Sequence, residues 1–194
     1  MCIRDSGKVL DPTGIGDEFS IALELAETKA LVVNLSLGGY TLDDLPPVAL
    51  QAAVEALWPD RVVVAAAGNN ASDRPFWPAA FKHVISVGAV DSRNGAVSRA
   101  AFSNYGSWVD VWAPGVDLVS TYVDGRWATA GHVVRFEGWA RWSGTSFAAP
   151  LVAATIAERA LASNPRVAAH DFLGSLPVEP GLGPLFVPSN DLTG

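Results

Sequence analysis

One serine stands where it could do chemistry. In the stretch "GTSFAAP", Ser146 precedes a run of small residues with helical spacing. Unpaired N–H groups and the dipole at a helix start favour negative charge, which suits a serine that attacks a carbonyl carbon. A plain helix cap is the alternative, and we interpret Ser146 as a nucleophile. We place Pro150 in the first helical turn, where a missing N–H is tolerated.

Asn69 is the second residue with a chemical role. It follows the apolar run "VVVAAAG". From that position its side-chain amide can donate a hydrogen bond to the oxyanion of a tetrahedral intermediate, and the backbone N–H of Ser146 would be the second donor. A turn asparagine after a strand is the alternative. Taken together with Ser146, the oxyanion role is the better hypothesis.

A serine nucleophile also needs a general base and a group that orients the base. The three histidines, His83, His132 and His170, are far apart and none lies in a suitable context. His132 falls in an insertion, residues 123–142, just before the serine. It would be the first histidine to test if the chain has a base of its own.

Alternating strands and helices must position these residues. We expect strands in the apolar runs at residues 30–36, 62–68, 83–90 and 108–115, the first two buried on both faces. Helices are expected after an N-cap at Asp17, from Pro46–Pro47 onward, and from Ser146 to about residue 162. This order predicts an α/β protein, a three-layer αβα sandwich with a mostly parallel sheet.

The apolar spacing also predicts which helix faces point inward. For the three helices in turn, the predicted inner residues are Phe19, Ala22, Leu23, Ala26 and Ala30; Leu50, Val54 and Leu57; and Phe147, Leu151, Ala154, Ala157 and Leu161. Residues 164–194 are rich in proline and glycine, and we expect an irregular tail there.

Composition excludes several classes of function. The 194 residues suggest one domain, and 49% hydrophobic residues provide enough material for a core. A net charge of −7 argues against binding to nucleic acid or anionic membranes. No apolar run is long enough for a membrane span. One cysteine and dispersed histidines match no metal-ligand spacing, so we expect no metal and no cofactor.

Three segments in a set order resemble the subtilisin-like serine peptidases, the subtilases. They are "VVNLSLGG" at residues 32–39, "VVVAAAGNN" at 62–70 and "SGTSFAAPLVAA" at 143–154, within a resemblance that runs from Gly7 to Ala162. The resemblance implies a serine endopeptidase that forms an acyl-enzyme on Ser146. It also implies a cis peptide bond between Trp77 and Pro78.

The resemblance implies a polypeptide substrate bound as an extended strand. The substrate would pair with Ser36, Leu37 and Gly38, and Ala66, Ala67 and Gly68 would form the opposite wall of the pocket for the residue before the scissile bond. The walls are made of small residues. We therefore expect a roomy slot and a preference for a large apolar or aromatic residue there.

The family's Asp motif, D-[ST]-G, and His motif, H-G-T, are both absent from this sequence. We therefore expect a spurious start at residues 1–6, the C-terminal part of a catalytic domain at 7–163 and a tail at 164–194, with a sheet incomplete at its N-terminal side. Such a chain should be inactive alone and expose an apolar sheet edge. A non-catalytic peptide-binding module, a short protein that has lost its Asp and His, is the alternative.

By family habit, the complete protein is expected to be secreted or at the cell surface and monomeric, with structural calcium possible.

Overall fold

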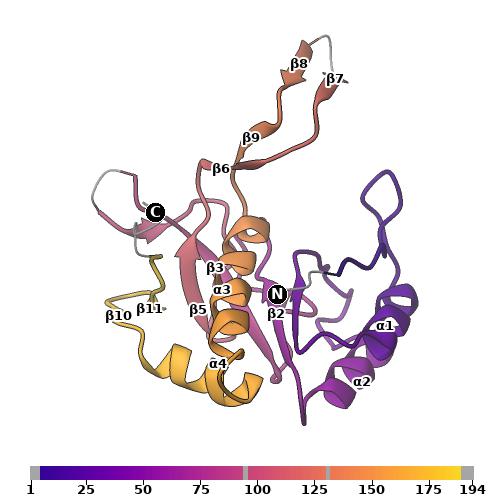
Figure 1. Cartoon of the computed structure of the whole chain (residues 1–194), viewed down its shortest axis with the longest axis vertical. Helices are drawn as coiled ribbons and strands as arrows, with labels where there is room; N and C mark the ends of the chain where they lie inside the picture. The colour runs from indigo at the N-terminus through magenta and orange to yellow at the C-terminus, as the bar shows by residue number, and fades with distance from the viewer. Residues whose placement is uncertain (1–4, 94–95, 130–131, 189–194) are drawn as a thin grey trace.

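A twisted sheet of five strands forms the centre of the molecule (Figure 1). The computed structural model describes residues 5–93, 96–129 and 132–188, except for the side chains of residues 128, 129 and 132. Four strands run parallel in the order β1, β2, β3, β5, and β4 pairs antiparallel with the end of β3. Their bounds are Val32–Leu35 for β1, Val62–Ala66 for β2, Val84–Asp91 for β3, Ser98–Arg99 for β4 and Val111–Pro114 for β5.

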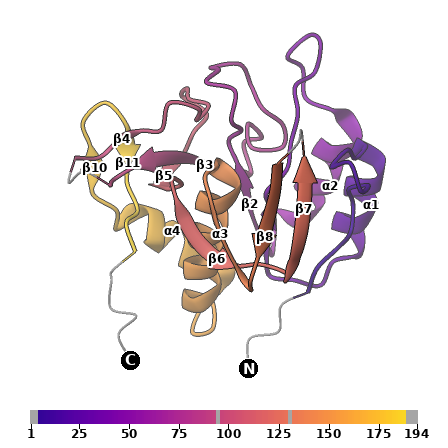
Figure 2. The same cartoon turned by 90° about the horizontal axis from the view of Figure 1, so that it is seen from above.

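Helices cover both faces of this sheet (Figure 2). They are α1 (Glu18–Glu27), α2 (Val48–Leu57), α3 (Thr145–Arg159) and α4 (Pro165–Gly174). Strand β2 is buried throughout and alternates its side chains between two cores. Val62 and Val64 pack in the core of α3 and α4, whereas Val63 packs in the core of α1 and α2. The predicted three-layer α/β fold is confirmed.

The inward face of α1 differs from the prediction. Ile21 and Leu25 are its buried residues, and Phe19 and Leu23 are each 66% exposed. Both pairs have the same spacing of four residues, so periodicity alone does not distinguish them, and packing against α2 decides. Asp17 is the N-cap as predicted, because its side chain accepts hydrogen bonds from the backbone of the first turn. In α2 the predicted residues are all buried.

Helix α3 packs on the sheet through its smallest residues. Ala148, Ala149, Val152, Ala153 and Ile156 are buried, which corrects the predicted stripe. Alanine and valine bring a helix close to a sheet, whereas Leu161, expected inside, lies beyond the helix and is 79% exposed. Pro150 is the sixth helical residue and not part of the first turn, so that expectation was wrong.

Residues 164–184 are not an irregular tail as predicted, because they contain a helix and two short strands. Asn164 caps α4 through a hydrogen bond from the Arg166 N–H at 2.9 Å, and Pro165 takes the first helical position. Phe172 of this helix is 1% exposed in the core beneath α3. Two short strands, β10 (Val178–Glu179) and β11 (Gly183–Pro184), follow as an antiparallel pair. Proline marked a helix start here, which composition alone does not reveal.

Strand β1 forms one edge of the sheet. Within the described residues it pairs with β2 only. We expected β1 to be buried on both faces, and this is wrong. Val32 and Val33 are half-buried and Asn34 is exposed. Its other edge carries unpaired backbone groups, as we expected from the absence of the family's Asp and His motifs.

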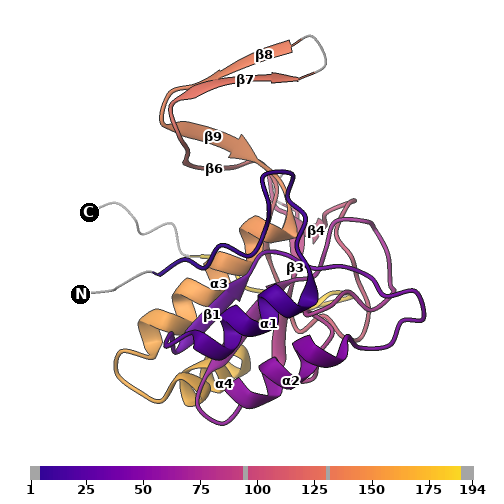
Figure 3. The ribbon, with the colours of Figure 1, turned by 90° about the vertical axis from the view of Figure 1, so that its right-hand side faces the viewer.

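A two-layered ribbon, which we call the arm, projects from the body (Figures 1 and 3). It comprises residues 118–142 and includes the insertion at residues 123–142, for which the sequence predicted no structure. Strands β6 (Leu118–Thr121) and β9 (Trp139–Trp142) pair antiparallel at its base. Strands β7 (Gly125–Thr129) and β8 (His132–Phe136) pair antiparallel in its outer part.

Candidate functional site

Three segments that are distant in the sequence meet where α3 begins. Ser36 follows β1, Asn69 follows β2, and Ser146 is the second residue of α3. The carboxyl ends of parallel strands share one edge of a sheet, and loops there lie beside the starts of the covering helices. The structure therefore brings together the nucleophile, the amide and the strand edge that the sequence predicted.

Ser36 and Ser146 are joined by hydrogen bonds in both directions. The Ser36 hydroxyl donates to the Ser146 carbonyl oxygen at 2.8 Å, and the Ser146 hydroxyl lies 3.4 Å from the Ser36 carbonyl oxygen. The Asn34 side-chain amide donates to the Ser36 hydroxyl at 2.9 Å. In a regular helix the Ser146 carbonyl would accept from residue 150, but Pro150 has no N–H. The proline thus frees this carbonyl for Ser36, a link that sequence reasoning missed.

The side chain of Asn69 is held through its oxygen. Its Oδ1 accepts from the Thr145 backbone N–H at 2.9 Å and from the Thr145 hydroxyl at 3.0 Å. That hydroxyl in turn accepts from the Gly68 N–H at 3.1 Å. No hydrogen bond among the described residues uses the Asn69 Nδ2, and a Cβ placed on Gly144 would lie 3.5 Å from this nitrogen. The Ser146 N–H belongs to the first helical turn, where backbone donors have no helical partner.

Asn104 anchors the loop that carries Asn69. Its side chain is fully buried and uses all of its hydrogen-bonding capacity. Nδ2 donates to the Ala67 carbonyl at 2.8 Å and to the Tyr40 hydroxyl at 2.9 Å, and Oδ1 accepts from the N–H groups of Asn70 and Ser72 at 2.9 and 3.1 Å. Sequence reasoning missed this residue, because nothing local signals a contact with the loop after β2.

The slot between the two predicted pocket walls is occupied. A Cβ on Gly38 would lie 2.4 Å from Cε1 of Phe76, and a Cβ on Gly68 would lie 3.1 Å from Cδ1 of the same ring. The Tyr40 ring packs edge-on against Phe76 at 5.1 Å. The expectation of a roomy slot is therefore wrong. Small wall residues do leave space, but the ring of Phe76, from the loop after β2, fills it.

The segment after Phe76 holds the predicted substrate edge. Gly39 and Trp77 exchange two backbone hydrogen bonds of 2.9 Å each. The peptide bond between Trp77 and Pro78 is cis, as the resemblance implied. Leu37, Gly38 and Gly39 are thereby held against a second extended segment, which leaves their other side toward the cleft.

A cavity of about 540 Å³ adjoins this edge. Ser36, Leu37 and Gly38 line one side, the loop at residues 14–16 lines another, and Ile21 is part of its apolar lining. Its place beside the predicted substrate edge gives an extended peptide room for side chains.

No described histidine is a hydrogen-bond partner of Ser146. His83 stacks on Trp58 at 3.9 Å, beyond the end of α2, and His170 is an exposed neighbour of Asp171 on α4. Strand β8 begins at His132, on the arm, but the His132 side chain lies outside the described residues. The described part of the chain therefore brings the predicted nucleophile and the predicted oxyanion donors together, and no described histidine side chain contacts Ser146.

The Asp110 carboxyl group is structural. Burial raises the pKa of Asp110, although hydrogen bonds from the Ser86 N–H at 2.8 Å and the Ser86 hydroxyl at 3.0 Å counteract this. Its partners belong to β3 and not to the site. Across residues 5–93, 96–129 and 132–188, no group of three or more His, Cys, Asp and Glu side chains could hold a metal ion. Nor is any helix there both long and apolar enough to cross a bilayer.

Comparisons with known proteins agree on one family. The model of the subtilase family matches residues 10–172. A thermophilic serine proteinase from Bacillus sp. (strain AK1) is 45% identical over 150 residues, which are 75% of this chain and 33% of that protein. Thermitase from Thermoactinomyces vulgaris is 37% identical over 150 residues, covering 75% of this chain and 47% of that protein.

A solved structure shows the same arrangement of elements. The crystal structure of a cold adapted subtilisin-like serine proteinase superposes with a TM-score of 0.75 at 28% identity. The match covers 95% of this chain and 66% of that one. The chain thus spans between a third and a half of the two curated relatives named above.

Proposed function

This chain belongs to the subtilase family, and from that premise we propose that it is part of a serine endopeptidase that acts through an acyl-enzyme on Ser146. The observation that carries the proposal is the convergence at the start of α3. There Ser146 lies beside a held amide at Asn69 and an open strand edge at Ser36.

The described side chains have distinct parts in the reaction. The Ser146 hydroxyl attacks the substrate carbonyl carbon, and the oxygen of the tetrahedral intermediate takes hydrogen bonds from the Asn69 Nδ2 and the Ser146 N–H. A general base must accept the hydroxyl proton and pass it to the leaving amine. The resemblance assigns that role to a His and its orienting Asp in motifs that this sequence does not contain. The chain by itself is therefore expected to be inactive.

The substrate is a polypeptide in extended form, paired with Ser36, Leu37 and Gly38. The contact of Phe76 with Gly38 and Gly68 favours a small residue, such as alanine or serine, before the scissile bond. Secretion and a monomeric state for the complete protein stay proposals from family habit, as does structural calcium.

Two experiments test the proposal. First, the genomic DNA upstream should encode D-[ST]-G and H-G-T motifs in frame with this chain. An in-frame stop codon between those motifs and this chain would contradict the proposal. Second, the product of the extended gene should hydrolyse a peptide anilide. Asn69→Ala should lower kcat by roughly 10²–10³, a magnitude for which a subtilisin is itself the reference case.

The matched control is Asn70→Ala at the next position, where the backbone N–H donates to Asn104 and the side-chain Oδ1 accepts one long hydrogen bond of 3.4 Å from the Tyr40 hydroxyl. This change should leave kcat within about twofold, because most exposed substitutions away from such contacts have small effects. Activity that survives Ser146→Ala would refute the acyl-enzyme.

A further inference from the structure

The arm exposes an unusually apolar surface beside the site. Three aromatic side chains of the arm are exposed: Trp127 by 50%, Tyr122 by 46% and Trp142 by 41%. Val133 and Val134 are exposed apolar residues of the same arm. A two-stranded ribbon has too little core to be stable by itself, and exposed patches of this kind on soluble proteins mark interaction sites. The ribbon lies above the start of α3, where Ser146 is (Figure 3).

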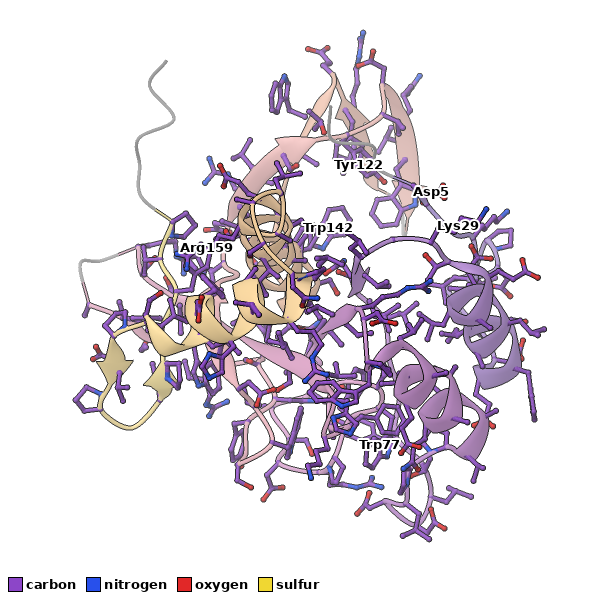
Figure 4. All side chains as sticks on the ribbon, turned by 60° about the horizontal axis from the view of Figure 1, so that its bottom comes forward. Asp5, Lys29, Trp77, Tyr122, Trp142 and Arg159 are labelled. Carbon is purple, nitrogen blue, oxygen red and sulfur yellow. The ribbon has the colours of Figure 1, made fainter. Side chains whose placement is uncertain are left out.

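A row of aromatic rings connects the arm to the site. The Phe147 ring, next to the nucleophile, stacks with Trp142 at 6.4 Å. Trp142 stacks with Trp127 at 6.2 Å and lies 6.4 Å from Tyr122, which contacts Phe136 at 4.7 Å. Figure 4 shows Tyr122 on the arm and Trp142 near the start of α3.

The rings enclose a hollow of about 190 Å³. Its lining is Tyr122, Val123, Gly125, Arg126, Trp127, Phe136 and Trp142. The register of β7 and β8 explains this composition. Gly125 pairs with Phe136, and Trp127 pairs with Val134, so the Trp127 and Phe136 side chains share one face of the ribbon.

The opposite face of the ribbon is basic. Arg126 pairs directly with Arg135 across the two strands, and Arg126 also reaches the lining of the hollow. Arg135 pairs with the Glu137 carboxylate at 3.2 Å, whereas Arg126 has no ion-pair partner among the described residues and can take a carboxylate from a ligand. The whole chain carries a net charge of −7, so this basic spot stands out on an acidic molecule.

The base of the arm is tied to the sheet near the nucleophile. The Asp117 N–H donates to the Ser143 hydroxyl at 2.9 Å, which closes the two ends of the arm on each other. Arg93 bridges Asp91 at the end of β3, at 2.7 Å, to Asp117. The Gly144 N–H donates to the Gly115 carbonyl at 2.8 Å. These contacts hold the hollow at a set place relative to Ser146.

We propose that the arm binds the leaving-group side of a polypeptide substrate, with an apolar side chain in the hollow and a carboxylate beside Arg126. This rests on the proposed function, in which the acyl side lies along Ser36–Gly38, and a peptide crossing Ser146 must continue toward the rings. Ring-to-ring steps of 6.4 and 6.2 Å separate Phe147 from Trp127. An extended chain rises about 3.4 Å per residue, so the hollow lies about four residues beyond the scissile bond.

The test measures binding to the product of the extended gene by fluorescence anisotropy of N-terminally labelled peptides, with Ser146→Ala introduced so that the peptides are not cleaved. One peptide, Ala-Ala-Val-Ala, covers the acyl side only. A second extends it by Ala-Ala-Ala-Trp-Glu, and a third is that extension alone. The extended peptide should bind about tenfold more tightly than the first, the effect of one well-packed aromatic side chain. Equal affinity of the first two peptides would overturn the proposal.

Variants locate the effect. Residues 122–138 are replaced by Asn-Gly, a two-residue turn that joins the paired residues Thr121 and Trp139. This change and Trp127→Ala should each abolish the tenfold gain and the binding of the third peptide, while the first peptide binds as before. Trp139→Ala is the matched control, since this 60% exposed tryptophan is outside the lining of the hollow. Replacing Glu by Lys in the peptide should reduce the gain, and Arg126→Glu should reverse that preference.

The outcomes separate this proposal from the proposed function. Failure of the first peptide with retained binding of the third would speak against the peptide cleft and not against the arm. A gain that persists after removal of residues 122–138 would refute the arm and leave the cleft intact. If the full chain is a dimer and the shortened chain a monomer in size-exclusion chromatography, a second copy covers the hollow and the proposal is wrong.

Discussion

At the scale of single residues, Pro150 and the Ser36 hydroxyl together determine the hydrogen bonding of the Ser146 carbonyl. Pro150 lies inside α3 and removes the donor that would serve the Ser146 carbonyl, and Ser36 replaces this donor from another segment. An acceptor left without a partner in a part-buried place destabilises the folded state by about 1–3 kcal/mol. The contact therefore links the position of the nucleophile to that of the substrate edge.

Ser36→Ala should lower the free energy of unfolding by about 1–3 kcal/mol. Pro150→Ala restores a helical N–H for the Ser146 carbonyl, so the same serine change should cost less in that background. Denaturant unfolding of the two single variants and the double variant measures the coupling, with about 1 kcal/mol expected. Additive effects would contradict the contact, and Ser163→Ala on the surface is the control for loss of a hydroxyl.

Phe76 decides the size of the slot next to the nucleophile. Phe76→Ala in the extended gene product should shift the preference before the scissile bond from alanine toward phenylalanine, by about 10–200-fold in the ratio of kcat/KM values. The change removes the ring that contacts Gly38 and Gly68. Anilide substrates that differ only at that residue give the measurement. Tyr105→Ala, at an exposed aromatic not in contact with the slot, should leave the ratio unchanged.

At the scale of elements, the arm depends on an ion pair at its base. Two hydrogen bonds from Arg93 to the Asp91 carboxylate lower the pKa of Asp91 to about 2. Because this pKa is depressed in the folded state, its contribution is present above about pH 4 and is lost as the pH falls toward 2. The pair is exposed to solvent, and its effect on global stability is correspondingly small.

Lowering the pH from 5 to 2 should therefore loosen the arm before the body unfolds. Near-ultraviolet circular dichroism reports the aromatic row, and far-ultraviolet circular dichroism reports the helices. We expect the first signal to fall at a higher pH than the second. Asp91→Asn should show the loosened signal already at pH 5, and coincident transitions in both proteins would contradict the role of this pair.

Helix faces show the limit of periodicity at this scale. In α1 two apolar pairs have equal spacing, and contact with α2 selects Ile21 and Leu25. In α3 the close approach to the sheet selects alanines over the larger Leu161. Strand β2, in contrast, was predictable throughout, since a continuous run of valine and alanine suits a strand buried on both faces.

At the scale of the whole molecule, the sheet has a free edge at β1 within the described residues. Unpaired N–H and C=O groups beside half-buried valines form a template for association with other strands. The 194-residue chain expressed alone should be poorly stable or aggregate. Size-exclusion chromatography with light scattering and thermal unfolding test this. A monomer with one cooperative transition would overturn it.

The sequence by itself determined the family and the alternation of strands and helices, and it predicted that Ser146 and Asn69 form the site. Ser146 and Asn69 lie in short segments whose local pattern carries their meaning, because the strand, the turn and the helix start are encoded by neighbouring residues. The cis bond between Trp77 and Pro78 followed from the resemblance to the subtilases.

Only the tertiary structure decided what fills the space between those segments. Phe76 against Gly38, Asn104 beneath the loop after β2 and Ser36 on the Ser146 carbonyl join residues from different elements of the chain. The stacking of Trp127 on Trp142 likewise joins two strands of the arm. Such contacts depend on how elements pack, and packing selects among faces and volumes that a local pattern leaves equivalent.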